Sequence, residues 1–172
     1  FSGEYSKEFK NSNRLTAEGD FFLSFNTARH YFKGINYSTM PWRLKVSTDY
    51  SGSGTVEDVK AATWTDISDR FIFATARTYN PTNSGTVNIT DLASDLPTYF
   101  AIEVQSEGKA SEGNSQGTFQ VDRFDIVLDV KDEDYSLAVA EFDRPGFVPV
   151  NVAGVHPTKS TTKDYWRNRG SF

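Results

Sequence analysis

The chain has 172 residues, the size of one ordinary domain, and a formal charge of −5 from 18 Lys and Arg against 23 Asp and Glu. An acidic surface repels phosphate backbones, so we expect no nucleic acid among its partners. Cys is absent, which excludes a disulfide framework, a cysteine-ligated zinc site and a cysteine nucleophile. Residue 1 is Phe and no signal peptide opens the chain, so we expect the numbering to begin inside a larger or processed protein.

Short runs of aromatic and β-branched residues, separated by turn residues, predict strands along most of the chain. Residues 1–18 are interpreted as an opening strand or arm that needs a neighbour to pack against. Apolar and polar residues alternate from Trp42 to Ser47, which is typical of a half-buried strand. The strands expected after residue 18 are 20–26, 42–47, 71–76, 85–89, 99–105, one or two within 119–130, 137–142 and 147–152.

Helical patterns are few, because only residues 56–62 and 90–96 can form a turn or two of helix. About nine strands joined by long loops therefore predict an all-β fold, an antiparallel jelly-roll β-sandwich. We expect this sandwich to span residues 1–155 and a C-terminal tail to span residues 156–172. The tail carries Tyr165, Trp166 and Phe172, and we expect it to gain order by docking these rings on a partner.

Catalytic motifs are missing from the sequence. The two histidines, His30 and His156, are 126 positions apart and lie in no metal or triad pattern. The carboxylates at 129 and 132–134 could serve a glycosidase only if two of them faced one cleft, and we interpret residues 131–134 as a solvated hairpin turn. We therefore predict that the protein is not an enzyme, with a glycoside hydrolase as a minor alternative.

Calcium is the one cofactor that we consider, since it takes oxygen ligands from loops at the end of a sandwich. Asp20, Asp122 and Asp125 are the candidate ligands, because each flanks apolar strand residues. The sequence contains no EF-hand loop pattern, and the alternative is that these residues are edge or capping carboxylates. No other cofactor is expected.

Aromatic residues are unusually abundant, with 3 Trp, 8 Tyr and 14 Phe. A ring presented to solvent stacks on the apolar face of a sugar while neighbouring polar groups bind its hydroxyls. Trp42, Tyr50 and Tyr79 stand at or near loops and are the candidate ligand-binding rings. The alternative is that each ring belongs to the hydrophobic core, which we also expect for Trp64.

Five blocks of sequence together resemble a known family. They are FSGEYSKEFKNSNRLTAEG, LKVSTDYSG, ATWTDISDRF, SGTVNITDL and GTFQVDRFDI, in this order over about residues 1–130. They resemble uncharacterised domains of Bacteroidetes outer-membrane surface lipoproteins, which are similar to cleaved-adhesin and carbohydrate-binding jelly-roll modules. The loop 53–60 looks lengthened, and Phe119 stands where that family often has Trp.

The resemblance implies an exported protein, lipid-anchored at the cell surface through a Cys upstream of residue 1, with an earlier β domain whose strand Phe1 continues. It assigns no catalytic residues. The function we expect first is a non-catalytic binding module for glycans, a polysaccharide or oligosaccharide, in an outer-membrane nutrient-uptake system. The alternative is a structural accessory lipoprotein subunit of a larger outer-membrane transporter complex.

Overall fold

The computed structural model describes residues 2–9, 18–30, 42–76, 78, 80–105, 118–140, 148–153, 158–161 and 165–169. Within these described residues, nine strands of four or more residues confirm the predicted all-β fold. They are β1 (Ser2–Phe9), β2 (Gly19–His30), β3 (Trp42–Ser47), β7 (Thr98–Gln105), β8 (Thr118–Val130), β9 (Ser136–Ala140), β10 (Val148–Ala153), β11 (Thr158–Thr161) and β12 (Tyr165–Arg169).

The remaining elements are short. They are helix α1 (Val56–Ala61), the two-residue strands β4 (Thr65–Asp66), β5 (Thr82–Asn83) and β6 (Val87–Asn88), and the 3₁₀ turns η2 (Ser68–Arg70) and η3 (Thr90–Leu92). Thr55 caps α1, since its hydroxyl accepts a hydrogen bond from the backbone N–H of Asp58. Among the described residues, no helix has the length and apolar character needed to cross a membrane.

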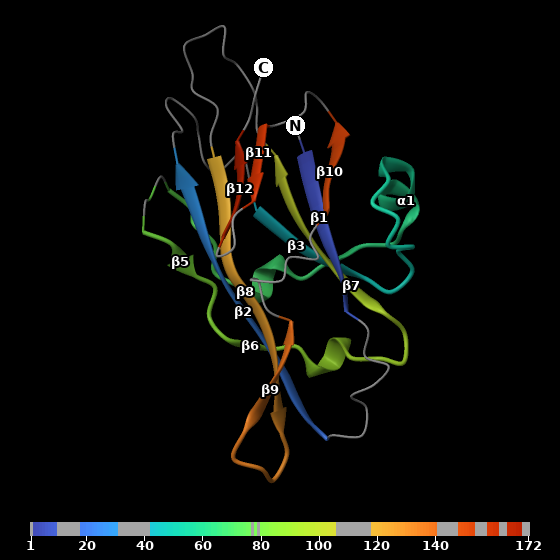
Figure 1. Ribbon diagram of the computed structural model, residues 1–172, viewed down its shortest axis with the longest axis vertical. Coiled ribbons are helices and arrows are strands. Elements are labelled where there is room, and N and C mark those ends of the chain that lie inside the picture. Colours follow the sequence, from blue (N-terminus) through green and yellow to red (C-terminus); the bar gives the residue numbers. More distant parts are fainter. Residues whose placement is uncertain are drawn as a thin grey trace, which may run out of the picture.

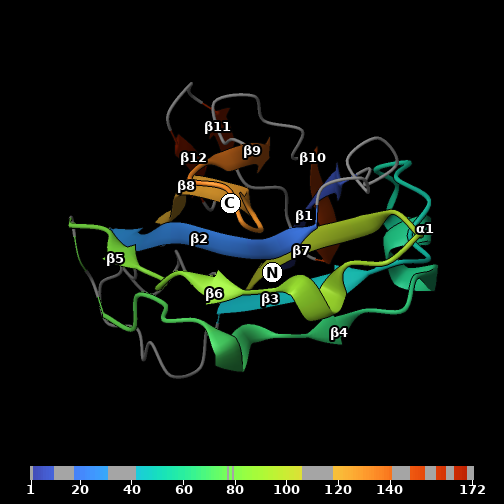
Figure 2. The ribbon, with the colours of Figure 1, turned by 90° about the horizontal axis from the view of Figure 1, so that it is seen from below.

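The strands form two antiparallel sheets that pack face to face. Sheet A has the order β10-β1-β7-β3-β4, and sheet B has the order β11-β12-β8-β2-β5, with β6 also paired to β2 and β9 to β8. Figure 2 shows the two layers, with β8, β9, β11 and β12 on one side and β3 and β4 on the other. The predicted opening strand is confirmed, because β1 lies between β10 and β7.

The main core fills the space between the sheets. Alternate residues of β3 are buried as predicted, with Leu44 at 0% exposure, and they meet Leu23, Phe25 and Phe124 from sheet B. Phe25 stacks on Phe124 with ring centroids 5.7 Å apart. Large aromatic rings therefore fill much of the layer between the sheets, which accounts for part of the aromatic excess.

A second, smaller core covers part of the outer face of sheet A. Tyr50, Val59, Tyr99 and Val150 are buried there, and the partly buried Trp64 packs against them. Strand β7 is consequently buried on both faces, with Tyr99 in the second core and Phe100 in the first. Strand β7 is therefore covered on one face by the second core, which includes Val59 of α1, and on the other face by sheet B.

The predicted strand at 71–76 is wrong. Its backbone bonds to side chains and single carbonyls instead of forming a ladder: the N–H of Ala74 donates to the Oγ1 of Thr27 at 2.9 Å, and the N–H of Ile72 donates to the carbonyl of Ser84 at 3.1 Å. The expected strand at 85–89 shortens to β6. The 13-residue β8 confirms the strand at 119–130, with a positive φ of 51° at Arg123 where its register with β2 shifts.

The backbone of the C-terminal tail joins the sandwich. Strand β12 pairs with β8 over five residue pairs, and β11 pairs with β12. Tyr165 and Trp166 lie in β12, although their side chains are outside the described residues, as is the whole of Phe172. In the described part of the tail, the chain's own sheet thus supplies the neighbour that the backbone requires.

Candidate functional site

A concave surface lies at one end of the described structure, beside the hairpin that joins β8 to β9. Strands β2 and β8 run along the long axis in Figure 1, and the β8–β9 hairpin forms the lower end. We call the concave surface the hairpin groove; its volume is about 700 Å³. Its lining residues are Gly19, Asp20, Phe22, Asp129, Val130, Lys131, Glu133, Asp134, Tyr135 and Ser136.

Backbone geometry at the hairpin sets the shape of the groove. The turn at 131–134 is confirmed as predicted, with Asp132 at a positive φ of 62° and the N–H of Glu133 donating to the carbonyl of Val130 at 3.3 Å. The N–H of Lys131 donates to the carbonyl of Glu18 at 2.8 Å, which ties the turn to the start of β2. The turn is therefore closed by its own backbone and tied to the start of β2.

Tyr135 is the exposed ring of the groove. Its side chain is 53% exposed, in contrast to the buried rings of the two cores. The ring directly follows the turn and precedes β9, and the carbonyl of Tyr135 accepts a hydrogen bond from the N–H of Val130 at 3.4 Å. A rigid ring beside polar groups is the arrangement that sugar-binding surfaces need.

The polar groups of the groove are mostly carboxylates. Asp20, Asp129, Glu133 and Asp134 are all exposed and line it together with one lysine, Lys131. Lys131 forms an ion pair with Glu18 at 3.3 Å, and the hydroxyl of Ser136 donates to Asp129. These groups can accept hydrogen bonds from several hydroxyls spread over an extended ligand.

The calcium candidates do not form one site. In the pairing of β2 with β8, Asp20 lies opposite Asp129, whereas Asp125 lies opposite Ser24 and Asp122 opposite Asn26. Asp20 accepts a hydrogen bond from the Thr90 hydroxyl at 3.3 Å. Within the described ranges, no three His, Asp or Glu side chains are grouped so that they could hold a metal ion. The strand register thus places these three carboxylates at separate points along sheet B.

Two of the three predicted ligand-binding rings are buried. Trp42 is 4% exposed, packs edge-on against Phe119 at 5.0 Å, and donates its indole N–H to the carbonyl of Ala74 at 3.2 Å. The guanidinium of Arg29 lies 5.6 Å from the Trp42 ring centroid. The expectation that Trp42 presents a ring to solvent is wrong, because this end of β3 faces the main core.

Tyr50 is 3% exposed and belongs to the second core, edge-on to Tyr99 at 5.1 Å. Its hydroxyl accepts a hydrogen bond from the N–H of Gly54 at 2.8 Å, so it organises its own loop instead of meeting a ligand. Trp64 packs against the same core as predicted and donates its indole N–H to the carbonyl of Val59 at 2.8 Å. Tyr79 and His156 lie outside the described residues, as does the side chain of His30.

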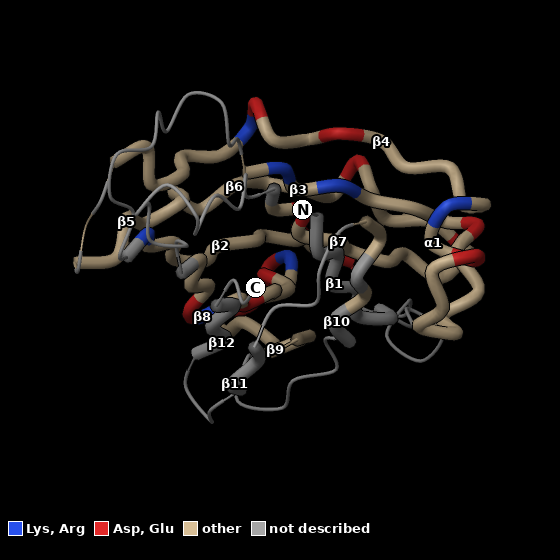
Figure 3. Tube along the Cα trace, turned by 90° about the horizontal axis from the view of Figure 1, so that it is seen from above, with Lys and Arg blue, Asp and Glu red and all other residues tan. Residues whose placement is uncertain are grey.

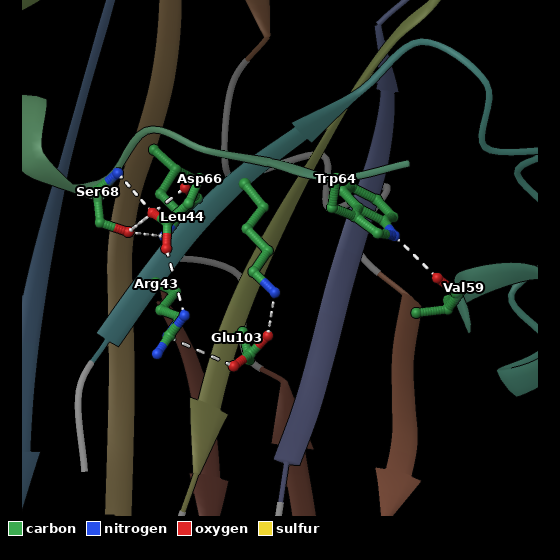
Figure 4. A network of polar contacts seen from close by, with 8 residues as sticks. Arg43, Leu44, Val59, Trp64, Asp66, Ser68 and Glu103 are labelled. Atoms are coloured by element: carbon green, nitrogen blue, oxygen red, sulfur yellow. Dashed lines mark hydrogen bonds and ion pairs between the residues drawn. The ribbon is translucent and has the colours of Figure 1, made fainter. Parts of the chain in front are cut away.

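A second polar cluster lies on sheet A, across β3, β4 and β7. Glu103 accepts a hydrogen bond from the ammonium of Lys45, and its Oε1 lies 3.7 Å from the Nε of Arg43. The Nη1 of Arg43 in turn lies 3.6 Å from the Oδ2 of Asp66 (Figure 4). Figure 3 shows the basic residues of β3 beside the acidic residue of β4. Burial would raise the pKa of Asp66, but hydrogen bonds from Ser68 and the charges of Arg43 and Lys45 outweigh it and lower the pKa. In this cluster, each charged side chain is opposed by one of opposite sign.

Sequence reasoning missed Tyr135 as a site residue. The ring follows the acidic run 132–134, which was interpreted only as a solvated turn, and the signal that could have found it is a lone aromatic residue next to that run. The contrast with Trp42 and Tyr50 is physical: those rings lie on strand faces or loops that contact a core, whereas Tyr135 lies on a hairpin that extends beyond the core.

The sequence matches a known domain family. The model of the family described as "Domain of unknown function (DUF5017)" matches residues 1–147, most of the chain. The chain belongs to the DUF5017 family. The match to this DUF5017 domain covers every residue of the hairpin groove. No curated protein and no solved structure matches the chain.

Proposed function

We propose that this DUF5017 domain is a non-catalytic glycan-binding module and that the hairpin groove is its binding site. The single observation that carries the proposal is the exposed ring of Tyr135, set in a groove of about 700 Å³ among carboxylates and a lysine. The ring supplies a stacking surface for the apolar face of a sugar, and the carboxylates accept its hydroxyl hydrogens.

The location follows from the resemblance to Bacteroidetes surface lipoproteins. A lipid-anchored module of an outer-membrane nutrient-uptake system would hold polysaccharide near a transporter. The open groove supports this role, since a long chain can lie across an open surface while only a few of its sugars make contact. In this proposal the ring and the carboxylates bind the glycan without a calcium ion.

Binding is favoured over hydrolysis by the exposure of the groove. Several carboxylates do line one concave surface, which the hydrolase alternative requires. Glycosidases, however, place their general acid in a desolvated pocket, and Asp129, Glu133 and Asp134 are exposed to solvent. Release of reducing ends from a bound oligosaccharide would establish hydrolysis in place of simple binding.

The accessory-subunit alternative rests on docking by the tail. Pairing of β12 with β8 makes the tail's backbone part of this chain's own sheet, so the described structure gives the tail a place without a partner. Glycan binding at the hairpin groove is therefore favoured over a docking role for the tail.

Affinity electrophoresis through a panel of soluble polysaccharides tests the proposal. The wild-type protein should be retarded by at least one glycan, and Tyr135→Ala should bind about tenfold more weakly through loss of ring stacking. Leu96→Ala is the matched control, because Leu96 is an exposed apolar residue (56%) outside the groove, and it should migrate like the wild type. Equal retardation of Tyr135→Ala and wild type would refute this site.

A further inference from the structure

The charge of the hairpin groove narrows its ligand class. Among the described residues, four carboxylates line the groove against one ammonium, that of Lys131, and Glu18 already opposes this ammonium at 3.3 Å. A glycan that lies on Tyr135 therefore meets an excess of negative charge. Salt screens charges beyond about 8 Å at physiological ionic strength, so these lining groups dominate what a bound sugar experiences.

The four carboxylates of the hairpin groove come from different segments and do not converge on one point. No three of the acidic side chains in the described part of the chain form a set fit for a metal ion, so the groove lacks the tight oxygen cage of a cation site. Asp20 comes from β2, Asp129 from the end of β8, and Glu133 and Asp134 from the turn. Such spacing suits several weak contacts along an extended ligand, with Tyr135 among them.

We propose that the groove selects glycans with free amino groups over neutral glycans and rejects uronic acid polymers. This inference rests on the proposed glycan-binding function and adds the charge class of the ligand. An ammonium group on a sugar stacked on Tyr135 pairs with the surrounding carboxylates, whereas the carboxylate of a uronic acid is repelled by them. Each exposed pair of this kind contributes modestly, so selectivity arises from several of them together.

Binding of three matched hexasaccharides to the full chain tests the inference: those of glucosamine, N-acetylglucosamine and galacturonic acid. Calorimetry at about pH 6, some two units above the ordinary pKa of a carboxyl group, should give affinities that decrease in that order. The double variant Glu133→Gln/Asp134→Asn should lose about fivefold in affinity for the glucosamine oligomer and little for the N-acetylated one. Its control, Asp69→Asn/Asp95→Asn, removes the same charge at exposed positions outside the groove and should behave as wild type.

The failures of the two proposals are distinguishable. Equal affinity for the amino and N-acetylated oligomers, or preference for galacturonic acid, would overturn the charge selectivity while leaving glycan binding intact. Loss of glucosamine binding in the control variant to the same degree would overturn it also, since overall charge would then be the cause. If oligolysine binds as tightly as the glucosamine oligomer, the groove selects positive charge and not amino sugars, and the proposal is overturned. Failure to bind any glycan, including the polysaccharide panel, would refute the proposed function itself.

Discussion

A Cβ atom on Gly19 would lie 2.0 Å from the carbonyl oxygen of Asp129. The backbones of β2 and β8 thus approach each other at the rim of the hairpin groove in a way that only glycine allows. Both residues line the groove, so this close approach helps to define its shape.

Gly19→Ala should therefore destabilise the protein and distort the groove together. A clash with backbone forces the strands apart, and overpacking of this kind costs about 1–3 kcal/mol. Urea unfolding gives the stability, and glycan retardation gives the state of the groove. Gly85→Ala is the contrasting variant: it meets no atom within 4 Å but has a φ of +81°, so it should cost about 1 kcal/mol and leave binding unchanged. A Gly19→Ala protein with wild-type stability would contradict the close approach.

Trp42 should matter for folding and not for glycan binding. Trp42→Ala empties a core position and removes a hydrogen bond to Ala74, so we expect a loss of about 3–5 kcal/mol in the free energy of unfolding. Trp42→Phe should fold, with a smaller loss, and should bind glycan like the wild type. Thermal unfolding combined with affinity electrophoresis checks both statements. Weakened glycan binding by a folded Trp42→Phe protein would return Trp42 to the list of site residues.

The interaction of Asp91 with Arg70 makes the stability of the folded protein depend on pH in the acid range. Hydrogen bonds from Arg70 at 2.9 and 3.0 Å, together with its charge, lower the pKa of this carboxyl below its ordinary value. A carboxyl with a lowered pKa in the folded state stabilises the protein above the unfolded pKa of about 4, and this stabilisation is lost as the pH falls through the folded value. The side chain of Asp91 is 63% exposed, so the pair contributes only about 0.5 kcal/mol.

The measurement is chemical unfolding of wild type and Asp91→Asn from neutral pH to about pH 3. The variant should be less stable at neutral pH, and the difference should shrink as the pH falls below about 4. Asp95→Asn, at an exposed position nearby in sequence, removes the same charge and is the control for the change in net charge. A difference that persists unchanged at low pH would mean that Arg70 does not stabilise the charged form of Asp91.

How far the sequence predicts the structure depends on which interactions a segment uses. Period-two alternation over Trp42–Ser47 predicted β3 correctly because its two faces meet different surroundings. The segment 71–76 has the same composition as a strand, yet its partners are the Thr27 hydroxyl and the Ser84 carbonyl, and no local pattern reveals those. Propensity identifies an extended backbone but not the ladder that makes it a strand.

The candidate site was less predictable than the fold. Exposure of a ring depends on what packs over it, and the second core that covers Tyr50 and Tyr99 requires α1 and β10 to come together across distant sequence. Tyr135 is exposed and belongs to the β8–β9 hairpin, which forms the lower end of the molecule in Figure 1. Sequence reasoning thus predicted aromatic rings for glycan binding but could not decide which rings remain at the surface.

The most direct test of the account is NMR spectroscopy of the uniformly ¹⁵N-labelled chain titrated with the glucosamine hexasaccharide. Amide shifts should concentrate at 19–22 and 129–136, the two segments that line the hairpin groove, and in Tyr135→Ala they should need about tenfold more ligand to reach the same size. Shifts centred instead on the charged cluster of Arg43, Asp66 and Glu103, with the amides of the groove unmoved, would contradict it.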